Sequence, residues 1–244
     1  MSFGSVKLIH NDGTMHHLGI DDTMVAKKVI LTPDPLAVPF YAALMDDAKK
    51  VGEYREYVTY TGTFHGQPLS VMSCGFGCMP MAIAVEELNH LGVSDIIKID
   101  ALPAIQPETE VGSLFAASGA VRGEGATREY VDISYPAVAD SGLLSGLLRQ
   151  GVKQVGIFRS HDCTGLEMPW NAEGKARIAR WAKLGVEVID GETSALFVIS
   201  SILKLHAASL ALITDNHATA ASLDNVDEGR KVLFRTAAEV LVCC

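Results

Sequence analysis

Short apolar runs alternate along most of the chain with longer segments in which apolar residues recur every three or four positions. Runs rich in β-branched and aliphatic residues predict strands, and the longer spacing predicts helices. We predict strands over residues 25–31, 57–64, 69–73, 95–99, 112–121, 154–158, 186–189 and 210–214. We predict helices over residues 36–49, 79–91, 141–149, 172–184, 192–205 and 225–242. Strands that alternate with helices indicate a parallel or mixed sheet covered on both faces.

Two neighbouring strands interrupt this alternation and predict an antiparallel hairpin. The strands over 57–64 and 69–73 are separated only by His65-Gly66-Gln67-Pro68, which is rich in turn-forming residues. No linker rich in proline or serine, no repeat and no low-complexity tract divides the 244 residues. The sequence therefore predicts one α/β domain over residues 1–244, long enough to bury a substantial core.

The composition and charge of the chain narrow the class of partner. Hydrophobic residues make up 48% of the sequence and charged residues 20%, which is typical of a compact globular protein. The net charge is −9 and no basic block occurs, so we expect no nucleic-acid partner. The N-terminal segment does not resemble a signal peptide, and the apolar stretches at 194–203 and 207–213 are too short or interrupted to span a bilayer. We expect a cytoplasmic protein with no membrane partner.

The cysteines do not follow a pattern typical of disulfides or of a zinc site. They are Cys74, Cys78, Cys163, Cys243 and Cys244. Their number is odd, their spacing is irregular, and no second Cys or His pair matches Cys74 and Cys78. We therefore expect free thiols in a reducing compartment and no metal. A second interpretation gives Cys78 a lowered pKa and some reactivity, because it stands at a helix start.

The segment 73–88 contains the clearest candidate for a ligand site. An apolar run over 69–72 leads into Gly75 and Gly77, and helical spacing follows at once. Glycines let a ligand approach the backbone closely, and the first N–H groups of a helix suit an anion or a polar ligand. One interpretation is a small-molecule site at the carboxyl end of a strand. The other is a simple strand-to-helix turn, which we favour for a Gly-x-Gly pair considered alone.

The surroundings of this loop match one family across most of the chain. The matching segments are HLGI (17–20), AALMD (42–46), YREYVTYTGTFHGQPLSV (54–71), GFG…IAVEELNHLG (75–92), AIQPETEVGS (104–113), GAVRGEGAT (119–127) and YPAVAD (135–140). The family signature, Gly-x-Gly followed by Ile-x-x-x-Glu-Leu, is met by Gly75, Gly77, Ile83, Glu87 and Leu88. The chain therefore resembles the uridine phosphorylase branch of the nucleoside phosphorylase family.

The resemblance implies a fold, a reaction and an assembly. The fold is a three-layer αβα arrangement with a mixed central sheet, usually assembled as a trimer of dimers. In the reaction, phosphate attacks the anomeric carbon of a nucleoside, and the products are the free base and (deoxy)ribose 1-phosphate. The expected partners are a nucleoside, phosphate and further copies of the chain, with no cofactor beyond phosphate as co-substrate. The transition state resembles an oxocarbenium ion, so the protein must hold the sugar and place the anion.

The resemblance also assigns residues to the sugar and to the neighbouring subunit's site. His17 matches a histidine that reaches the neighbouring site and binds the sugar 5′-hydroxyl. Arg55 matches a catalytic arginine that contacts phosphate in that neighbouring site. Glu192 matches the glutamate that binds the ribose hydroxyls, and Gly191 replaces a methionine that packs under the ribose. Considered without the family, His17 indicates a solvated loop residue, Arg55 a member of a surface ion pair and Glu192 a helix cap.

The phosphate site departs from the family pattern. The loop Gly-Asp-Pro-x-Arg becomes PDPLA at 33–37, which removes one backbone N–H and the arginine. The loop Arg-x-Gly-Thr-x-Gly becomes KIDALP at 98–103, in which a lysine replaces the arginine. The remaining phosphate contacts are expected from Arg55, Lys98 and Gly75. Each lost charge-assisted hydrogen bond contributes about 1.5–3 kcal/mol, so we expect weaker phosphate binding.

The base site departs from the pattern as well. The Gln-x-Arg pair with which uridine phosphorylases read uracil has no counterpart in the run 158–170. The polar candidates for contact with the base are Arg159, His161, Asp162 and Glu167. Asp215 matches an aspartate that protonates the leaving purine in the purine-specific branch, and it is our second catalytic candidate. The alternative for Asp215 is an Asx-type turn at the end of a strand.

Three functions are consistent with these residues. We favour a nucleoside phosphorylase with an altered phosphate site. The second is a nucleosidase in which water replaces phosphate and is oriented by Asp100 or Glu192. The third is a catalytically weak nucleoside-binding protein. The altered phosphate loops favour the last two functions, whereas the retained sugar residues favour a working enzyme.

Overall fold

The β-strands of the described chain belong to one mixed sheet. The computed structural model describes residues 9, 10 and 12–243, and within them the sheet has 11 strands in the order β11-β10-β6-β8-β9-β5-β1-β4-β3-β2, with β7 paired to β6. The strands are β1 (Lys28–Thr32), β2 (Asp46–Tyr54), β3 (Tyr57–Phe64), β4 (Gln67–Ser73), β5 (Asp95–Ala104), β6 (Leu114–Gly123), β7 (Ala137–Val138), β8 (Gln154–His161), β9 (Val186–Asp190), β10 (His206–Asn216) and β11 (Ala221–Ser222). Strand β10 also pairs with β5, which closes a circuit through β6, β8 and β9.

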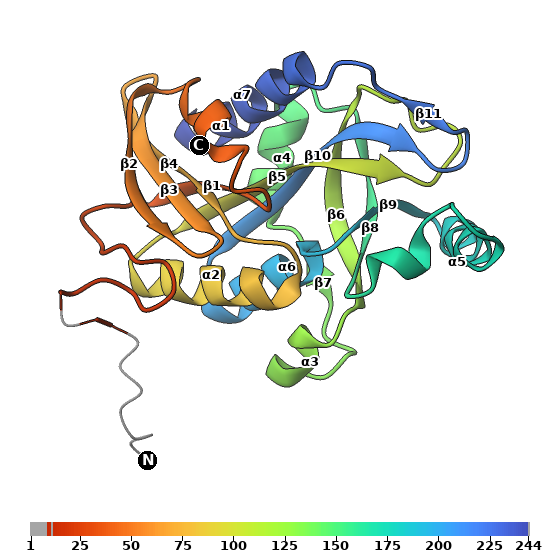
Figure 1. Ribbon diagram of the computed structural model, residues 1–244, viewed down its shortest axis with the longest axis horizontal. Helices are drawn as coiled ribbons and strands as arrows, with labels where there is room; N and C mark the ends of the chain where they lie inside the picture. The colour runs from red at the N-terminus through yellow and green to blue at the C-terminus, as the bar shows by residue number, and fades with distance from the viewer. Residues whose placement is uncertain (1–8, 11, 244) are drawn as a thin grey trace.

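Helices cover both faces of this sheet. They are α1 (Val38–Ala42), α2 (Cys78–His90), α3 (Ala126–Tyr130), α4 (Ser141–Arg149), α5 (Ala172–Lys183), α6 (Thr193–Leu203) and α7 (Asp227–Cys243), with a 3₁₀ turn at Thr164–Glu167. Helices α2 and α6 lie side by side on one face, and α1, α4 and α7 lie on the other (Figure 1). One hydrophobic core contains Leu88 and Phe197 beneath the first pair, and a second contains Tyr41 and Phe234. This arrangement confirms the α/β fold expected from the sequence.

Several strands run further toward their carboxyl ends than the sequence predicts. Strands β5, β8 and β10 continue past residues 99, 158 and 214. Pairing between β5 and β10 along most of their length satisfies the backbone groups of these two extensions, and β6 pairs with the extension of β8. The extensions carry Asp100, Arg159, His161 and Asp215, so strands rather than loops position these candidates.

The helix predicted over 36–49 is wrong. Only Val38–Ala42 is helical, and residues 46–54 form β2, which pairs with β3. Pro39 has no N–H to donate and therefore suits only the first turn of a helix. The backbone N–H and C=O groups on the free edge of β3 form hydrogen bonds with residues 46–54. The side-chain pattern of the sequence does not reveal that β3 has this free edge.

Some of the sequence predictions concern residues outside the part of the chain that the structure describes. Residues 1–8, from which we expected no signal peptide, and Cys244 lie outside the described residues. Within the part of the chain that is described, no helix combines the length and apolar character needed to cross a membrane.

The core beneath α7 gives a test of the fold. Phe234 is fully buried, and its ring stacks on Tyr41 with centroids 5.6 Å apart. We expect Phe234→Ala to lower the free energy of unfolding by about 3–5 kcal/mol, because the change leaves a cavity. The matched control is Val232→Ala on the same helix, where the side chain is 47% exposed and a change below about 0.5 kcal/mol is expected. Chemical denaturation measures both variants, and equal losses would contradict the packing described for α7.

Candidate functional site

The loop between β4 and α2 turns its backbone toward a carboxylate of the same chain. Gly75 and Gly77 have φ angles of +71° and +101°, which favour glycine. A Cβ atom at Gly75 would lie 2.8 Å from Cγ of Glu56, so glycine lets the β2–β3 turn approach this loop. The N–H group of Gly77 donates a hydrogen bond to Oε1 of Glu192 at 2.8 Å. Glu192 therefore occupies the anion position that we expected at the start of α2.

Lys98 lies at the centre of the site with its side chain fully buried. Its Nζ atom is 2.8 Å from Oδ2 of Asp190, 2.9 Å from Oε2 of Glu192 and 3.3 Å from Oδ2 of Asp100. The side chains of Asp190 and Glu192 are also fully buried, whereas Asp100 keeps 20% exposure. A lone buried ammonium group is strongly unfavourable, so these carboxylates make the burial of Lys98 possible. Lys98, which we expected at the phosphate, has its charge paired with carboxylates.

Asp190 is the most firmly held member of this cluster. Its Oδ1 atom accepts a hydrogen bond from the Ser160 hydroxyl at 2.6 Å. Its Oδ2 atom accepts from Lys98 at 2.8 Å, from the N–H of Thr193 at 2.9 Å and from the Thr193 hydroxyl. The resemblance matches Asp190 to the first glutamate of the family's Glu-Met-Glu sugar motif, and the sequence gave no signal for Ser160 or Thr193.

Burial and Lys98 together set the charges of the cluster. Burial raises the pKa of Glu192 to about 7, although Lys98 opposes the rise. Burial also acts to raise the pKa of Asp190, but Lys98 and the hydrogen bonds from Ser160 and Thr193 outweigh it and lower that pKa. For Lys98, burial acts to lower the pKa, and the carboxylates raise it well above its usual range. Burial raises the pKa of Asp100 as well, against the charge of Lys98. At neutral pH, Lys98 and Asp190 are therefore charged, and Glu192 titrates in the neutral range.

His17 is held by Glu87, a buried residue of α2. Glu87 accepts hydrogen bonds from the N–H of His17 at 3.1 Å and from the N–H of Leu18 at 2.9 Å. Nδ1 of His17 lies 2.6 Å from Oε1 of Glu87, so Nδ1 carries a proton that it donates to the carboxylate. The sequence matched both residues to the family without indicating that they touch. This contact fixes the N-terminal loop on α2 and leaves the His17 side chain 27% exposed.

Arg55 lies at the tip of the β2–β3 hairpin, with its side chain exposed. It adopts a φ of 54°, and its guanidinium carbon is 5.3 Å from the ring centroid of Tyr54. The next residue, Glu56, packs beside Gly75. The structure therefore places Arg55 next to the glycine loop but outside the buried Lys98 cluster.

Arg159 belongs to a second buried cluster, near the end of β8. Its Nε and Nη2 atoms each donate to the carboxylate of Glu167 at 2.8 Å. Its guanidinium carbon lies 3.9 Å from a ring centroid of Trp181, whose Nε1 donates to Glu167 at 3.1 Å. Burial acts to raise the pKa of Glu167, but Arg159, His161 and Trp181 together outweigh it and lower that pKa. The structure brings two base candidates together as an ion pair and adds Trp181, which the sequence did not indicate.

His161 and Asp162 follow Arg159 but differ in their surroundings. His161 is buried, and its Nε2 atom lies 3.6 Å from Oε2 of Glu167 and has no hydrogen-bond partner among the described residues. Burial lowers the pKa of His161, so its ring is neutral at pH 7. Asp162 is exposed and accepts a hydrogen bond from the N–H of Gly125 at 2.9 Å. Of the two, His161 is the one that offers an unfilled polar atom.

Asp215 lies along β10 away from the Lys98 cluster. In the pairing of β10 with β5, Ser209 is opposite Lys98 and Asp215 is opposite Pro103. At ~3.3 Å per residue, positions 209 and 215 are roughly 20 Å apart along the strand. Oδ1 of Asp215 accepts a hydrogen bond from the Ser222 hydroxyl at 2.9 Å, beside a surface hollow of about 530 Å³. The structure does not bring Asp215 together with Glu192.

Two departures from the family pattern have visible consequences. In the loop at 33–37, Oδ1 of Asp34 accepts a hydrogen bond from the N–H of Leu36 at 2.8 Å, so the loop bonds to itself. A Cβ atom at Gly191 would lie 3.5 Å from Cζ of Phe76, so the phenyl ring lies next to the glycine that replaces the methionine.

The described cysteines show neither a reactive thiol at the helix start nor a metal site. Cys78 is buried and its Sγ atom donates to the carbonyl oxygen of Gly191 at 3.0 Å. Burial raises the pKa of the Cys78 thiol, so the interpretation of a lowered pKa is wrong. Glu192 already occupies the anion position at this helix start. Over residues 9, 10 and 12–243, no three or more His, Cys, Asp or Glu side chains are grouped to hold a metal ion.

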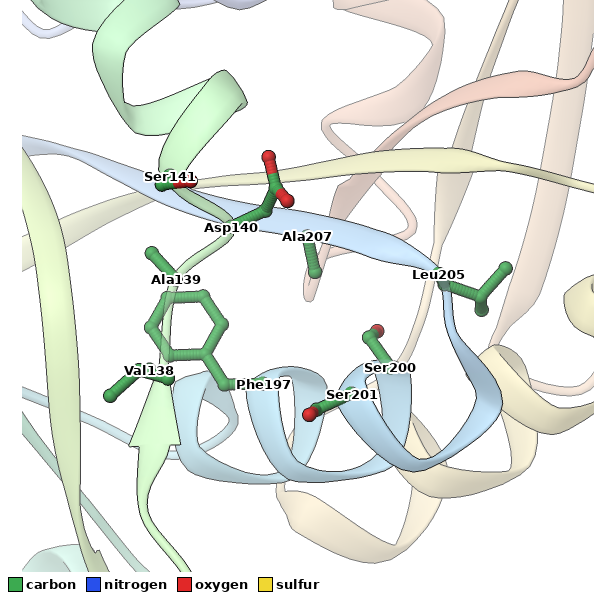
Figure 2. Close-up of a pocket in the computed structure, with 9 residues that line it drawn as sticks. All are labelled: Val138, Ala139, Asp140, Ser141, Phe197, Ser200, Ser201, Leu205 and Ala207. Atoms are coloured by element: carbon green, nitrogen blue, oxygen red, sulfur yellow. The ribbon is translucent and has the colours of Figure 1, made fainter.

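A separate cavity of about 260 Å³ lies at the other end of α6. Figure 2 shows the hydroxyl of Ser200 directed toward Ala207 and Asp140 at the start of α4. Ser200 is buried, and its hydroxyl has no hydrogen-bond partner within the described chain. The residues that line this cavity do not include Lys98, Asp190 or Glu192, so it is not part of the candidate site.

The burial of Cys78 predicts the order in which the thiols react. In the folded chain we expect a maleimide reagent to modify Cys163, which is exposed, and to leave Cys74 and Cys78 unmodified. Peptide mass spectrometry after a short reaction identifies the modified residues, and the unfolded chain is the control in which all three react. Modification of Cys78 at the rate of Cys163 would contradict its burial.

Comparison with known proteins agrees with this geometry. The model of the Phosphorylase superfamily matches residues 27–242. The chain is 32% identical over 221 residues to uridine phosphorylase from Treponema pallidum, covering 86% of each chain. It is 33% identical over 220 residues to uridine phosphorylase from Thermococcus kodakarensis, covering 85% of this chain and 79% of the relative. The crystal structure of uridine phosphorylase from Vibrio fischeri, complexed with 6-hydroxy-1-naphthoic acid, superposes with a TM-score of 0.84 at 30% identity and covers 95% of this chain and 97% of that one. The chain therefore belongs to the phosphorylase superfamily.

Proposed function

We propose that this chain is a nucleoside phosphorylase of the uridine phosphorylase type. This pentosyltransferase uses phosphate to cleave an N-glycosidic bond and releases the free base and (deoxy)ribose 1-phosphate. The observation that carries the proposal is the buried carboxylate of Glu192, held between the amide of Gly77 and Lys98 in a member of this superfamily. Uridine is the first substrate to test, because the similar proteins named above are uridine phosphorylases.

Glu192 suits the sugar end of a nucleoside. An ionised carboxylate accepts hydrogen bonds from two hydroxyl groups, as the 2′- and 3′-hydroxyls of ribose require. The oxocarbenium-like transition state carries positive charge on the sugar, and a fixed carboxylate in a buried site stabilises that charge more strongly than water does. Asp190 adds a second fixed negative charge beside it. Gly191 and the ring of Phe76 then lie where the underside of the ribose is expected.

In this proposal, phosphate binds at the rim of the site. The exposed Arg55 of a neighbouring copy supplies the positive charge, and the Gly75 loop supplies backbone that an anion can approach. Lys98 contributes less to phosphate than the family pattern implies, because three carboxylates already surround it. Its main role in our proposal is to neutralise the sugar site.

We also propose that the working protein is a homo-oligomer. Large apolar side chains are exposed in the loops around the site and in the first turn of α2, and a second copy of the chain would cover them. They are Leu36 at 86%, Phe76 at 64% and Met79 at 68%. In such an assembly, His17 and the exposed Arg55 would complete the site of a neighbour. A cytoplasmic location stays a prediction from the sequence.

The base is expected to lie beside His161. Its neutral ring offers Nε2 as a buried, unfilled hydrogen-bonding atom, whereas Arg159 is neutralised by Glu167. We therefore propose His161 as the main contact of the base, with Arg159 behind it and Asp162 at the surface. Asp215 is a candidate acid only for a base that extends along β10 toward it.

The proposal predicts that cleavage depends on phosphate. With uridine as substrate, we expect release of uracil in the presence of phosphate and almost none in its absence. Chromatography of a nucleoside panel, each member with and without phosphate, detects the free bases. Equal release without phosphate would identify a nucleosidase, and no release from any nucleoside would indicate a binding protein; either result would refute the proposed function.

Arg55 is predicted to act on phosphate more than on the nucleoside. We expect Arg55→Ala to raise the KM for phosphate roughly 10- to 100-fold, because a charge-assisted contact of about 1.5–3 kcal/mol is lost. The KM for the nucleoside should change much less. The matched control is Arg235→Ala on α7, an exposed arginine on the opposite layer, for which no change is expected. Unchanged phosphate kinetics in Arg55→Ala would remove Arg55 from the site.

A further inference from the structure

The cavity at the carboxyl end of α6 contains a buried hydroxyl group that the described chain does not satisfy. Ser200 is 1% exposed, and its Oγ atom has no hydrogen-bond partner among the described residues. In Figure 2 this hydroxyl points away from α6 and into the cavity of about 260 Å³. A buried hydroxyl without a partner is unfavourable, so Ser200 favours a ligand that can bond to it.

Asp140 gives the same cavity a negative charge. Its Oδ1 atom accepts a hydrogen bond from the N–H of Leu143 at 2.9 Å and so caps α4. Over the part of the chain that the structure describes, the Asp140 carboxylate forms no ion pair. The residues that line the cavity include no lysine, arginine or histidine. A helix start alone would suit an anion, but the unpaired charge of Asp140 opposes an anion and favours a cation.

The cationic side chains nearest to this carboxylate are used elsewhere. An adjoining cavity shares Asp140 and also contains Lys28 and His206. Lys28 donates a hydrogen bond to the carbonyl oxygen of Leu241, and Nδ1 of His206 lies 3.1 Å from Oδ1 of Asp95. The chain therefore supplies Asp140 with no positive partner of its own.

The other walls of the cavity are apolar. Phe197, Leu205 and Ala207 are buried, and Val138 and Ala139 come from β7 and the segment after it. An aromatic face such as that of Phe197 also attracts a cation. Cavities of about 300–1,000 Å³ hold drug-sized ligands, so this one suits a smaller molecule. Apolar walls beside a carboxylate and a hydroxyl suit an organic cation that has an apolar body.

We propose that this cavity binds a small organic ammonium ion. Its charged group donates hydrogen bonds to the Asp140 carboxylate and the Ser200 hydroxyl, and its apolar body packs on Phe197 and Leu205. Ser200 lies roughly 12 Å from Glu192 along the axis of α6, at ~1.5 Å per residue. The ammonium site is therefore separate from the sugar site, and it does not depend on the proposed function.

Three probes of similar shape separate the effect of charge from that of shape. They are 2-phenylethylammonium chloride, the neutral 2-phenylethanol and the anionic 3-phenylpropanoate, each added to the full chain without nucleoside at constant ionic strength. The amide signals of ¹⁵N-labelled protein detect binding, and we expect the shifts to centre on residues 138–141 and 200–207. The ammonium ion should saturate with a Kd on the order of 1 mM, the alcohol should bind about tenfold more weakly, and the carboxylate should not bind. Equal binding of the three probes, or no saturable shift in these segments, would overturn the proposal.

Two substitutions test the groups that hold the cation. Asp140→Asn removes the charge and keeps a residue type that is preferred at a helix N-cap. We expect Asp140→Asn to weaken binding of 2-phenylethylammonium about tenfold and Ser200→Ala to weaken it about threefold. The matched control is Asp227→Asn, which removes a carboxylate in the first turn of α7, outside the cavity, and should leave binding unchanged. Undiminished binding in Asp140→Asn would contradict the role of the carboxylate.

The stability of Ser200→Ala gives a separate measurement. Because Oγ of Ser200 has no partner in the described chain, we expect the variant to unfold at the same denaturant concentration as the unmodified chain or at a higher one. A lower midpoint would show that the hydroxyl is already bonded within the chain, and the proposal would then fail.

Discussion

The candidate site depends on one buried ammonium group. Lys98 has no exposed surface, and three carboxylates lie within 3.3 Å of its Nζ atom. Moving such a charge out of water is highly unfavourable unless opposite charges accompany it, so Lys98 and its carboxylates must be buried together. These contacts join β5 to β9 and to the start of α6, and Glu192 extends them to the glycine loop before α2. Segments far apart in the chain meet here because of a single positive charge.

This cluster also explains how a changed phosphate loop can coexist with a retained sugar site. The lysine at position 98 points its hydrogen bond at Asp190, beside Glu192, rather than toward an open anion site. The first phosphate loop bonds to itself through Asp34, and the exposed arginine is left at the hairpin tip. In the proposed phosphorylase, the ribose 2′- and 3′-hydroxyls are therefore bound within one chain, whereas phosphate and the 5′-hydroxyl depend on the rim of the site and on the neighbouring copy.

The sequence predicted the elements whose patterns are local and long, and it missed features that depend on distant partners. Helices α2 and α4 and the β3–β4 hairpin lie where the spacing of apolar residues placed them. The strand over 46–54 was missed because its pairing with β3, and not its side-chain pattern, determines it. The resemblance supplied both Lys98 and Glu192, but that Lys98 bonds to Asp190, 92 positions away, follows only from the folded chain. Burial likewise raises the pKa of Cys78, against the second interpretation drawn from its place at a helix start.

The most direct measurement is a crystal structure of the chain with uridine and sulfate, which stands in for phosphate without reacting. We predict a ribose hydroxyl about 2.7 Å from Oε2 of Glu192, with Nζ of Lys98 still donating to Asp190 and sulfate beside Arg55. A ribose bound away from Glu192, or Lys98 turned from Asp190 onto the sulfate, would contradict the role assigned to the buried charge cluster.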